Sequence, residues 1–395
     1  MRAGVAAALD NEGVADGQQY LADLRFSSED WLEDWQLQAH FSYLYANLEA
    51  QFQLFPDNAL LPIGGDGNPD FIKPAGMVFF PDGVNEALGR KQQIPAVELG
   101  GIYRGLQDHR IRFGAGYRHE EISTDDARNF GPGVIDASMP VVDGGLTDVK
   151  GLRLAYLPDM QQDEWQIASD WHLTAGLRYD YYTDFGSTIN PRLALVWDVS
   201  KRFTSKLLYG KAFRAPTFSE MGNANNPVIL GNPNLEPETN HTVELAFDYR
   251  PWHNLRTAAN VYYYAIEDLI QPVLDANGTS ATAQNTGEQT GYGLELEWNW
   301  QMTENWNFRG NYAWQNARNE QLGQRSNLPG DDRVLENYQI VDITLRSRRF
   351  LKHLDLAASV RNLFDADARE PAVPQIPGNL PLPGRSFYLE ASVHF

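Results

Sequence analysis

Apolar and polar residues alternate along the last segment of the chain. Every odd position from Phe387 to Phe395 carries an apolar side chain, and the even positions between them carry Tyr, Glu, Ser and His. Successive side chains of a β-strand point to opposite faces of a sheet. The pattern therefore predicts a strand with one apolar face and one mostly polar face.

The same alternation recurs along most of the chain. The segments that carry it lie at residues 36–45, 110–118, 171–180, 243–250, 292–300, 306–315, 341–346 and 354–361. One such segment is ambiguous, but a long series of them separated by turn residues indicates a single extended sheet. An apolar face repeated on every strand is typical of a sheet closed around a polar interior and exposed to lipid outside.

The connections between these segments alternate in length. Short connections rich in Asp, Asn, Pro and Lys are predicted near residues 198–202, 250–254 and 301–305. Long connections are predicted near residues 46–95, 120–148, 213–240, 266–291, 316–336 and 363–384. Outer-membrane barrels show this asymmetry, with short periplasmic turns and long extracellular loops, whereas a soluble sandwich or propeller gives no reason for it.

The predicted fold is all-β: an antiparallel transmembrane β-barrel with about fifteen strands present. The first strand is predicted near Tyr20–Phe26. Barrels of this class usually have an even number of strands, so we expect the chain to form part of a larger barrel. In domain terms, residues 1–19 are expected to be the remnant of an extracellular loop and residues 20–395 the partial barrel.

Composition agrees with a membrane barrel and excludes several other classes. Apolar residues make up 43% of the chain, yet charges interrupt every stretch long enough for a membrane-spanning helix. The 10 Trp, 18 Tyr and 19 Phe are sufficient for two interfacial aromatic girdles. The chain has no Cys, which excludes disulfides and thiolate metal sites, and its net charge of −20 argues against nucleic acid as a partner.

Catalytic motifs are missing from the sequence. The 8 His residues are scattered, with no zinc-protease pattern, phosphate-binding loop or nucleophile elbow. The carboxylate pairs Asp125–Asp126 and Asp331–Asp332 lack calcium-loop spacing and are interpreted as solvated turns. We therefore expect no enzymatic activity, no cofactor and no bound metal.

Several motifs, taken together and in order, resemble the C-terminal part of TonB-dependent outer-membrane receptors. The resemblance is strong over roughly residues 150–395, and the earlier part of the chain shares only the alternation. The motifs are Leu208–Pro216, Asn232–Thr239, Asn285–Glu288, Gly291–Glu295, Val360–Asp365, Pro383–Arg385 and the terminal Phe395.

This resemblance implies a 22-stranded barrel whose lumen is filled by an N-terminal plug domain. Such receptors bind a scarce nutrient outside the cell, usually a ferric siderophore and otherwise cobalamin, haem or a sugar, and import it with energy from the TonB system. Compared with that pattern, the given sequence is expected to lack the plug and about seven of the strands. The expected function is therefore that of a receptor and transporter barrel, with TonB as a partner only if a plug is supplied.

The resemblance also implies a location and further partners. The location is the cell outer membrane of a Gram-negative bacterium, and the partners are its lipid, a ferric siderophore or similar chelate, and the barrel-assembly machinery. In this family the machinery reads a terminal aromatic residue, here Phe395. An ordinary girdle role for that residue is the alternative interpretation.

Six residues at the extracellular ends of inward positions and in nearby loops are the candidates for ligand contact. They are Arg118, Tyr182, Arg214, Phe218, Tyr264 and Gln315. Arginine combined with aromatic side chains suits a bulky anionic chelate. The alternative for each residue is ordinary loop or girdle chemistry. Other inward charges, among them Arg112, Arg178, Arg192 and Asp180, are expected to form a hydrated lattice of ion pairs.

Three other functions remain open at this point. A passive porin-like channel would share the alternation and the loops, and a barrel without a plug would conduct ions. An outer-membrane hydrolase would need a nucleophile and a base that the sequence does not supply. A truncated product would have no independent transport, and its open sheet edges would favour aggregation or oligomerisation.

Overall fold

The fold is known from a computed structural model. It describes residues 14–65, 67–71, 74–131, 134, 151–158, 160–223, 229–276, 280–319, 338–370 and 380–394.

Long strands dominate the structure. Their bounds are β1 (Val14–Leu32), β2 (Trp35–Phe55), β5 (Val84–Tyr103), β6 (His109–Arg128), β7 (Gly151–Pro158), β8 (Met160–Ala168), β9 (Trp171–Tyr182), β10 (Gly186–Ser200), β11 (Phe203–Arg214), β13 (Glu238–Trp252), β14 (Leu255–Leu274), β15 (Ala281–Gln301), β16 (Trp306–Asn319), β17 (Tyr338–Leu351), β18 (Leu354–Arg361) and β21 (Ser386–Val393).

Short elements lie in the connections. They are β3 (Ala59–Ile63), β4 (Gly76–Phe80), α2 (Phe218–Gly222), β12 (Ile229–Leu230), β19 (Arg369–Glu370) and β20 (Leu380–Pro381). No helix in the described ranges has the length and apolar character needed to cross a membrane.

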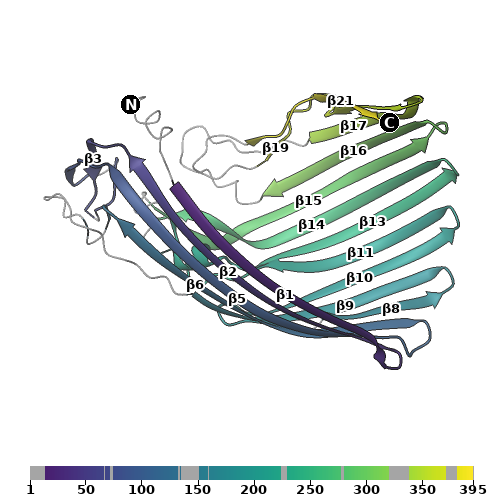
Figure 1. Ribbon diagram of the computed structural model, residues 1–395, viewed down its shortest axis with the longest axis horizontal. Helices are drawn as coiled ribbons and strands as arrows, with labels where there is room; N and C mark the ends of the chain where they lie inside the picture. Colours follow the sequence, from purple (N-terminus) through teal and green to yellow (C-terminus); the bar gives the residue numbers. More distant parts are fainter. Residues whose placement is uncertain are drawn as a thin grey trace.

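One antiparallel sheet of 17 strands, curved along its whole width, contains all the long strands (Figure 1). Consecutive long strands pair with each other, except that β7 and β8 share one position between β6 and β9. The two-residue strand β12 is parallel to β15. Within the described residues, β1 pairs only with β2 and β21 only with β18, so these two strands form the edges. Because β7 and β8 share one position, the long strands occupy fifteen positions in the sheet, which confirms the predicted count of about fifteen strands.

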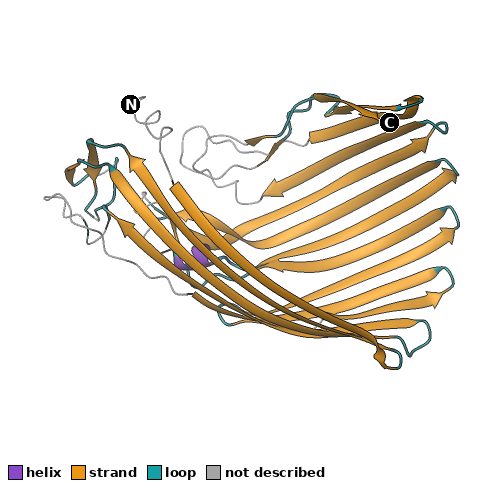
Figure 2. Ribbon diagram, viewed as in Figure 1, coloured by secondary structure: helices purple, strands orange, loops and turns teal. Residues whose placement is uncertain are grey.

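The sheet has an apolar outer face and a polar inner face. On the outer face Phe41, Leu193 and Val261 are 46%, 45% and 49% exposed, although a soluble protein would bury such a row. The inner face at the same height carries residues such as His40 and Arg192. Strands account for almost the entire ribbon (Figure 2), so the structure confirms the predicted all-β class.

The two ends of the strands differ as predicted. At one end, here called the short-turn end, tight turns join β1 to β2, β10 to β11 and β13 to β14. Asp34 adopts a positive φ of 65° in the first of these turns, a conformation that Asp tolerates better than most residues. The opposite end, here called the long-loop end, carries the connections that contain β3, β4, α2 and β12.

A small lobe at the long-loop end contains a cluster of buried apolar side chains. The hairpin β3–β4 packs one face against residues that flank it and against the segment after β6. The lobe core consists of Leu61, Ile63, Val78, Phe80, Val84, Phe130 and Val134. Because the sheet turns its apolar face outward, this core belongs to the lobe and not to the sheet.

Three predicted loops are partly strand. β2 continues to Phe55 and β5 begins at Val84, within the predicted loop 46–95. β6 continues to Arg128, so Asp125 and Asp126 lie in a strand and not in a turn, while Asp331 and Asp332 lie outside the described residues. β14 and β15 likewise extend into the predicted loop 266–291. The sequence pattern does not predict these extensions as strands, because their outer face is polar and the apolar side of the alternation is missing there.

Two predictions concern the ends of the chain. β1 begins at Val14, inside the segment 1–19 that was expected to be a loop remnant, and the division at residue 19 stays a prediction. The proposed assembly signal, Phe395, lies outside the described residues.

Candidate ligand-binding surface

A row of residues crosses four neighbouring strands on the inner face. Arg112 on β6 is opposite Gln162 on β8, which is opposite Gly176 on β9, which is opposite Arg192 on β10. Neighbouring strands lie about 4.8 Å apart, so the two arginines start about 14 Å from each other. Gly176 leaves an open floor between them because it has no side chain.

The guanidinium groups of Arg112 and Arg192 have no ion-pair or hydrogen-bond partner within the part of the chain that the structure describes. Arg178, two residues from Gly176, is different. Its side chain donates three hydrogen bonds to the Asp180 carboxylate at 2.6–2.9 Å. Asn190 also donates to Asp180, which is fully buried. The expected ion-pair lattice thus forms at Arg178 but leaves two cations available.

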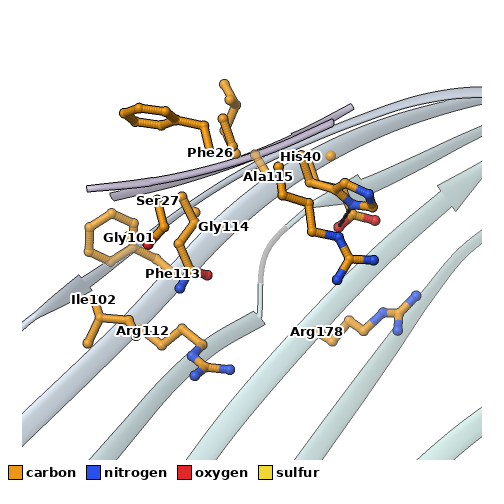
Figure 3. A pocket seen from close by; sticks show the side chains of 17 residues that line it. Phe26, Ser27, His40, Gly101, Ile102, Arg112, Phe113, Gly114, Ala115 and Arg178 are labelled. Atoms are coloured by element: carbon orange, nitrogen blue, oxygen red, sulfur yellow. Dashed lines mark hydrogen bonds and ion pairs between the residues drawn. The ribbon is translucent and has the colours of Figure 1, made fainter. Parts of the chain in front are cut away.

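Two cavities meet at Arg178. The first, of about 680 Å³, is lined on the inner face by His40, Glu98, Gly100, Arg112 and Gly114, together with Arg178. Figure 3 shows the side chains of Arg112 and Arg178 entering this space from different strands. The second cavity, of about 520 Å³, is lined by Arg178, Tyr182, Asn190, Arg192 and Arg214. The combined lining of the two cavities carries more cations than anions, which favours an anionic ligand.

A three-residue ion cluster organises the long-loop end above the second cavity. Arg214, at the end of β11, donates to Glu238 at 2.6 and 2.7 Å and to Glu220 of α2 at 2.9 and 3.0 Å. Glu238 also accepts the backbone N–H of Ile270 at 2.8 Å. One cation thus ties β11, β13, β14 and the helix together.

The same cluster fixes the start of α2. Thr217 is the N-cap, its hydroxyl accepts the N–H of Glu220, and the Glu220 carboxylate accepts the N–H of Thr217 in return. Burial alone raises the pKa of Glu220, but hydrogen bonds from Arg214 and Thr217 outweigh it and bring the pKa below its ordinary range. The carboxylate is therefore ionised wherever the cluster is intact.

Asn285 holds the following loop in place. Its side-chain N–H groups donate to the backbone carbonyls of Glu236 and Asp268, both at 2.8 Å, and its oxygen accepts the N–H of Glu236. The loop that precedes β13 is thereby fastened to β15 across β14. This arrangement gives a structural reason for the Asn285–Glu288 motif.

Two tyrosines of β14 lie over glycines of β15. A Cβ atom at Gly291 would meet the ring of Tyr264, and one at Gly293 would meet the ring of Tyr262. The Tyr264 hydroxyl accepts a hydrogen bond from Gln289, and the Tyr262 hydroxyl donates to Gln315 at 3.4 Å. The glycines of this motif therefore allow inner-face aromatic rings to lie flat against the wall.

The structure brings the six predicted ligand residues into two groups and one separate position. Tyr182 and Arg214 line the same cavity, and Phe218 begins the helix that Arg214 anchors. Tyr264 and Gln315 both neighbour Tyr262. Arg118 stands apart on β6, paired with Glu120 at 2.7 Å. Their role in binding stays a prediction.

Sequence reasoning assigned Arg112 and Arg192 to the ion-pair lattice instead of to the candidate site. Inward parity identified their face, but the register that aligns them across Gly176 depends on pairings over four strands. The available signal was inward glycine on the strands beside an inward arginine, since Gly176 and Gly210 both lie opposite Arg192. The described residues contain no cluster of three or more His, Asp or Glu side chains suited to a metal ion.

Comparison with known proteins yields one family. The family model described as TonB dependent receptor-like, beta-barrel matches residues 4–337. The iron-regulated outer membrane virulence protein of Vibrio cholerae is 30% identical over 145 residues, which cover 34% of this chain and 22% of that protein. The vitamin B12 transporter BtuB of Vibrio cholerae is 34% identical over 134 residues, or 34% of this chain and 20% of that protein.

Solved structures share the fold. The copper transporter OprC has a TM-score of 0.60 at 17% identity, with 96% of this chain and 66% of that chain covered. The outer membrane transporter YddB from Escherichia coli has a TM-score of 0.59 at 11% identity, with 97% and 63% covered.

The matched regions span about a fifth of the curated relatives, and the chain covers somewhat under two thirds of the solved YddB chain. The family match extends over most of the chain and agrees with the lipid-facing sheet and its unequal ends. The chain therefore belongs to the family of TonB-dependent receptor-like β-barrels of the Gram-negative outer membrane.

Proposed function

We propose that this chain forms the barrel wall of a receptor that takes up an anionic ferric chelate of the siderophore class. The observation that carries the proposal is the pair Arg112 and Arg192, which lack partners among the described residues and are aligned on the inner face across Gly176. Ferric siderophore complexes are bulky and usually anionic. Guanidinium groups match such ligands because they bind oxygen donors in a bidentate manner and stay charged.

The relatives support this substrate class without fixing the substrate. One curated relative is named as iron-regulated, another as a transporter of vitamin B12, and a structural neighbour as a copper transporter. A solved structure with a TM-score of 0.53 is the ferric-catecholate import receptor Fiu of Escherichia coli. Cobalamin has no comparable array of anionic oxygens, so the two free arginines favour the iron chelate.

Energy for import would come from the TonB system, acting through a plug domain inside the lumen. Within the described residues the inner face encloses no domain of its own. The cavities at Arg178 would then form part of the lining that the chelate meets on its way through the barrel.

Binding of a ferric catecholate chelate to the chain in lipid nanodiscs tests the proposal. Replacing both Arg112 and Arg192 by Gln should weaken binding by at least about tenfold, since each lost charge-assisted contact contributes on the order of 1.5 kcal/mol. Arg309→Gln is the control for loss of a cation elsewhere on the inner face, because it removes one positive charge at β16, where Arg309 donates to Asn307.

The proposal is wrong if the double variant binds as tightly as the Arg309→Gln control. Planar-bilayer recordings test the passive channel separately. Large, stable currents that the chelate does not alter would favour the channel instead.

A further inference from the structure

The polarity of the two faces of the sheet inverts along β2. Up to Tyr45 the outer face is apolar, but beyond it the outer positions are Asn47, Glu49, Gln51 and Gln53. The inner positions over the same stretch are all apolar. They are Leu44, Ala46, Leu48, Ala50, Phe52 and Leu54.

The neighbouring strands extend this apolar inner surface. Leu88 and Ile94 of β5 are opposite Ala50 and Leu44, and Ile122 of β6 is opposite Gln92. We call the surface formed by Leu44, Leu48, Phe52, Leu88, Ile94 and Ile122 the vestibule stripe. Ile94 and Ile122 are buried at its floor, while Leu48 and Phe52 remain 37% and 42% exposed.

Lipid does not explain the vestibule stripe. The stripe faces the concave side of the sheet, and the outer face at the same height is polar, as expected for a wall that stands in water on both sides. Exposed apolar area in water is unfavourable by roughly 25 cal/mol per Å² and in monomeric proteins often marks a binding site.

A free cation flanks the stripe. Arg90 of β5 is opposite Leu48 on one side and Thr124 on the other, and its guanidinium has no ion-pair partner within the described part of the chain. The stripe also lies above the first of the two cavities, on the same strands. Leu44 lies four residues from His40 on the same strand, a separation of about 13 Å. An apolar surface that leads to a cationic cavity is complementary to an anionic amphiphile.

We infer that the ligand is an acylated ferric chelate, whose anionic head is first bound by Arg90 and whose fatty acyl chain lies on the vestibule stripe, before the chelate passes to Arg112 and Arg192, about 40 Å farther along the strands. The inference rests on the proposed function and adds the lipophilic part of the ligand. Arg90 would contact the anionic oxygens of the head, beside Leu48 of the stripe.

The test compares two ferric tris-catecholate probes, both with an anionic head, that differ only in carrying an acetyl or a dodecanoyl group. Binding is measured by equilibrium dialysis against the full chain in nanodiscs, where no free detergent competes for the stripe. The dodecanoyl probe should bind at least about tenfold more tightly, because each buried CH₂ contributes roughly a factor of four. The variants Leu48→Asn and Phe52→Asn should each reduce that preference about fivefold or more, without changing the affinity for the acetyl probe. Gln51→Asn, on the opposite face, should preserve it.

A second measurement uses the absence of cysteine in the chain. An environment-sensitive fluorophore attached through Thr124→Cys, beside Arg90, should shift to shorter wavelength when the dodecanoyl probe is added and not when the acetyl probe is added. This readout depends on local water exclusion and does not require a core substitution.

The outcomes separate the two proposals. Equal affinity for both probes, unchanged in Leu48→Asn, overturns the acyl-chain inference and leaves the proposed function standing. A fluorophore that is already shielded before any probe is added also overturns it, because another segment then covers the stripe. If neither probe nor the ferric catecholate binds, the proposed function fails and the inference fails with it.

Discussion

The ion cluster at the long-loop end provides the sharpest test of how the structure is held together. Glu238 is 9% exposed and accepts two hydrogen bonds from Arg214 and one from the backbone N–H of Ile270. In a Glu238→Gln variant one carboxylate oxygen becomes an amide N–H₂. If the remaining oxygen keeps the Ile270 bond, the new N–H₂ group faces the Nε–H of Arg214.

The cost follows from these contacts. A hydrogen bond between charged groups contributes about 1.5–3 kcal/mol. The Arg214 side chain is 42% exposed and retains its two bonds to Glu220, so water and the second carboxylate offset part of the loss. We therefore expect Glu238→Gln to lower the free energy of opening this region by about 1–2 kcal/mol, which corresponds to roughly 5- to 30-fold more frequent opening.

Hydrogen exchange followed by mass spectrometry measures that opening directly. Peptides that cover Ile270 and α2 should exchange roughly 5- to 30-fold faster in Glu238→Gln than in the unmodified chain. Glu236→Gln is the control, because Glu236 makes its described contacts with Asn285 through backbone atoms. If the two variants exchange at the same rate, the cluster does not stabilise the loop and the reasoning is refuted.

Three further predictions concern pH, glycine and the membrane. The pKa of Glu220 lies below its ordinary value of 4.5. The Glu220 carboxylate therefore stabilises α2 fully above pH 4.5, and this stabilisation is lost as the pH falls through the lowered pKa. Glu220→Gln should abolish the acid-induced rise in hydrogen exchange at α2. Gly293→Ala places a Cβ atom against a tyrosine ring and a backbone carbonyl and should lower the free energy of unfolding by about 1–3 kcal/mol. The control is Gly210→Ala, whose Cβ atom meets open space. Folding yield into vesicles distinguishes the two variants. Phe41→Arg should destabilise the barrel by about 2–4 kcal/mol and Gln51→Arg by under about 1 kcal/mol, as measured by urea titration in lipid vesicles.

The sequence was sufficient to predict the sheet, its two faces and the approximate number of strand positions. Each of these depends on alternation within one strand, such as that of Phe387–Val393, and needs no knowledge of neighbouring strands. The tight turns at 201–202 and 253–254 were likewise local, since they lie in the short connections 198–202 and 250–254, which are rich in Asp, Asn, Pro and Lys.

The candidate site depended on information that alternation does not contain. The alignment of Arg112 with Arg192 requires the register of four strands, and the burial of Asp180 requires Asn190 from the next strand. Alternation predicts a loop for the upper part of β2, because the positions that are apolar up to Tyr45 become polar beyond it. The error and the vestibule stripe therefore have the same physical origin.

The height of the apolar band places the membrane on the strands. On β2 the apolar outer positions run from Trp35 to Tyr45, about 33 Å of strand at ~3.3 Å per residue. With a tilt of about 40° this corresponds to about 25 Å along the membrane normal, the height of the apolar band in outer-membrane barrels. The aromatic residues at its two limits match the interfacial girdles, and Trp171 to Tyr181 of β9 spans the same length. The rest of β2, from Ala46 to Phe55, must then stand above the hydrocarbon, so the apolar residues of its inner face require an occupant other than lipid.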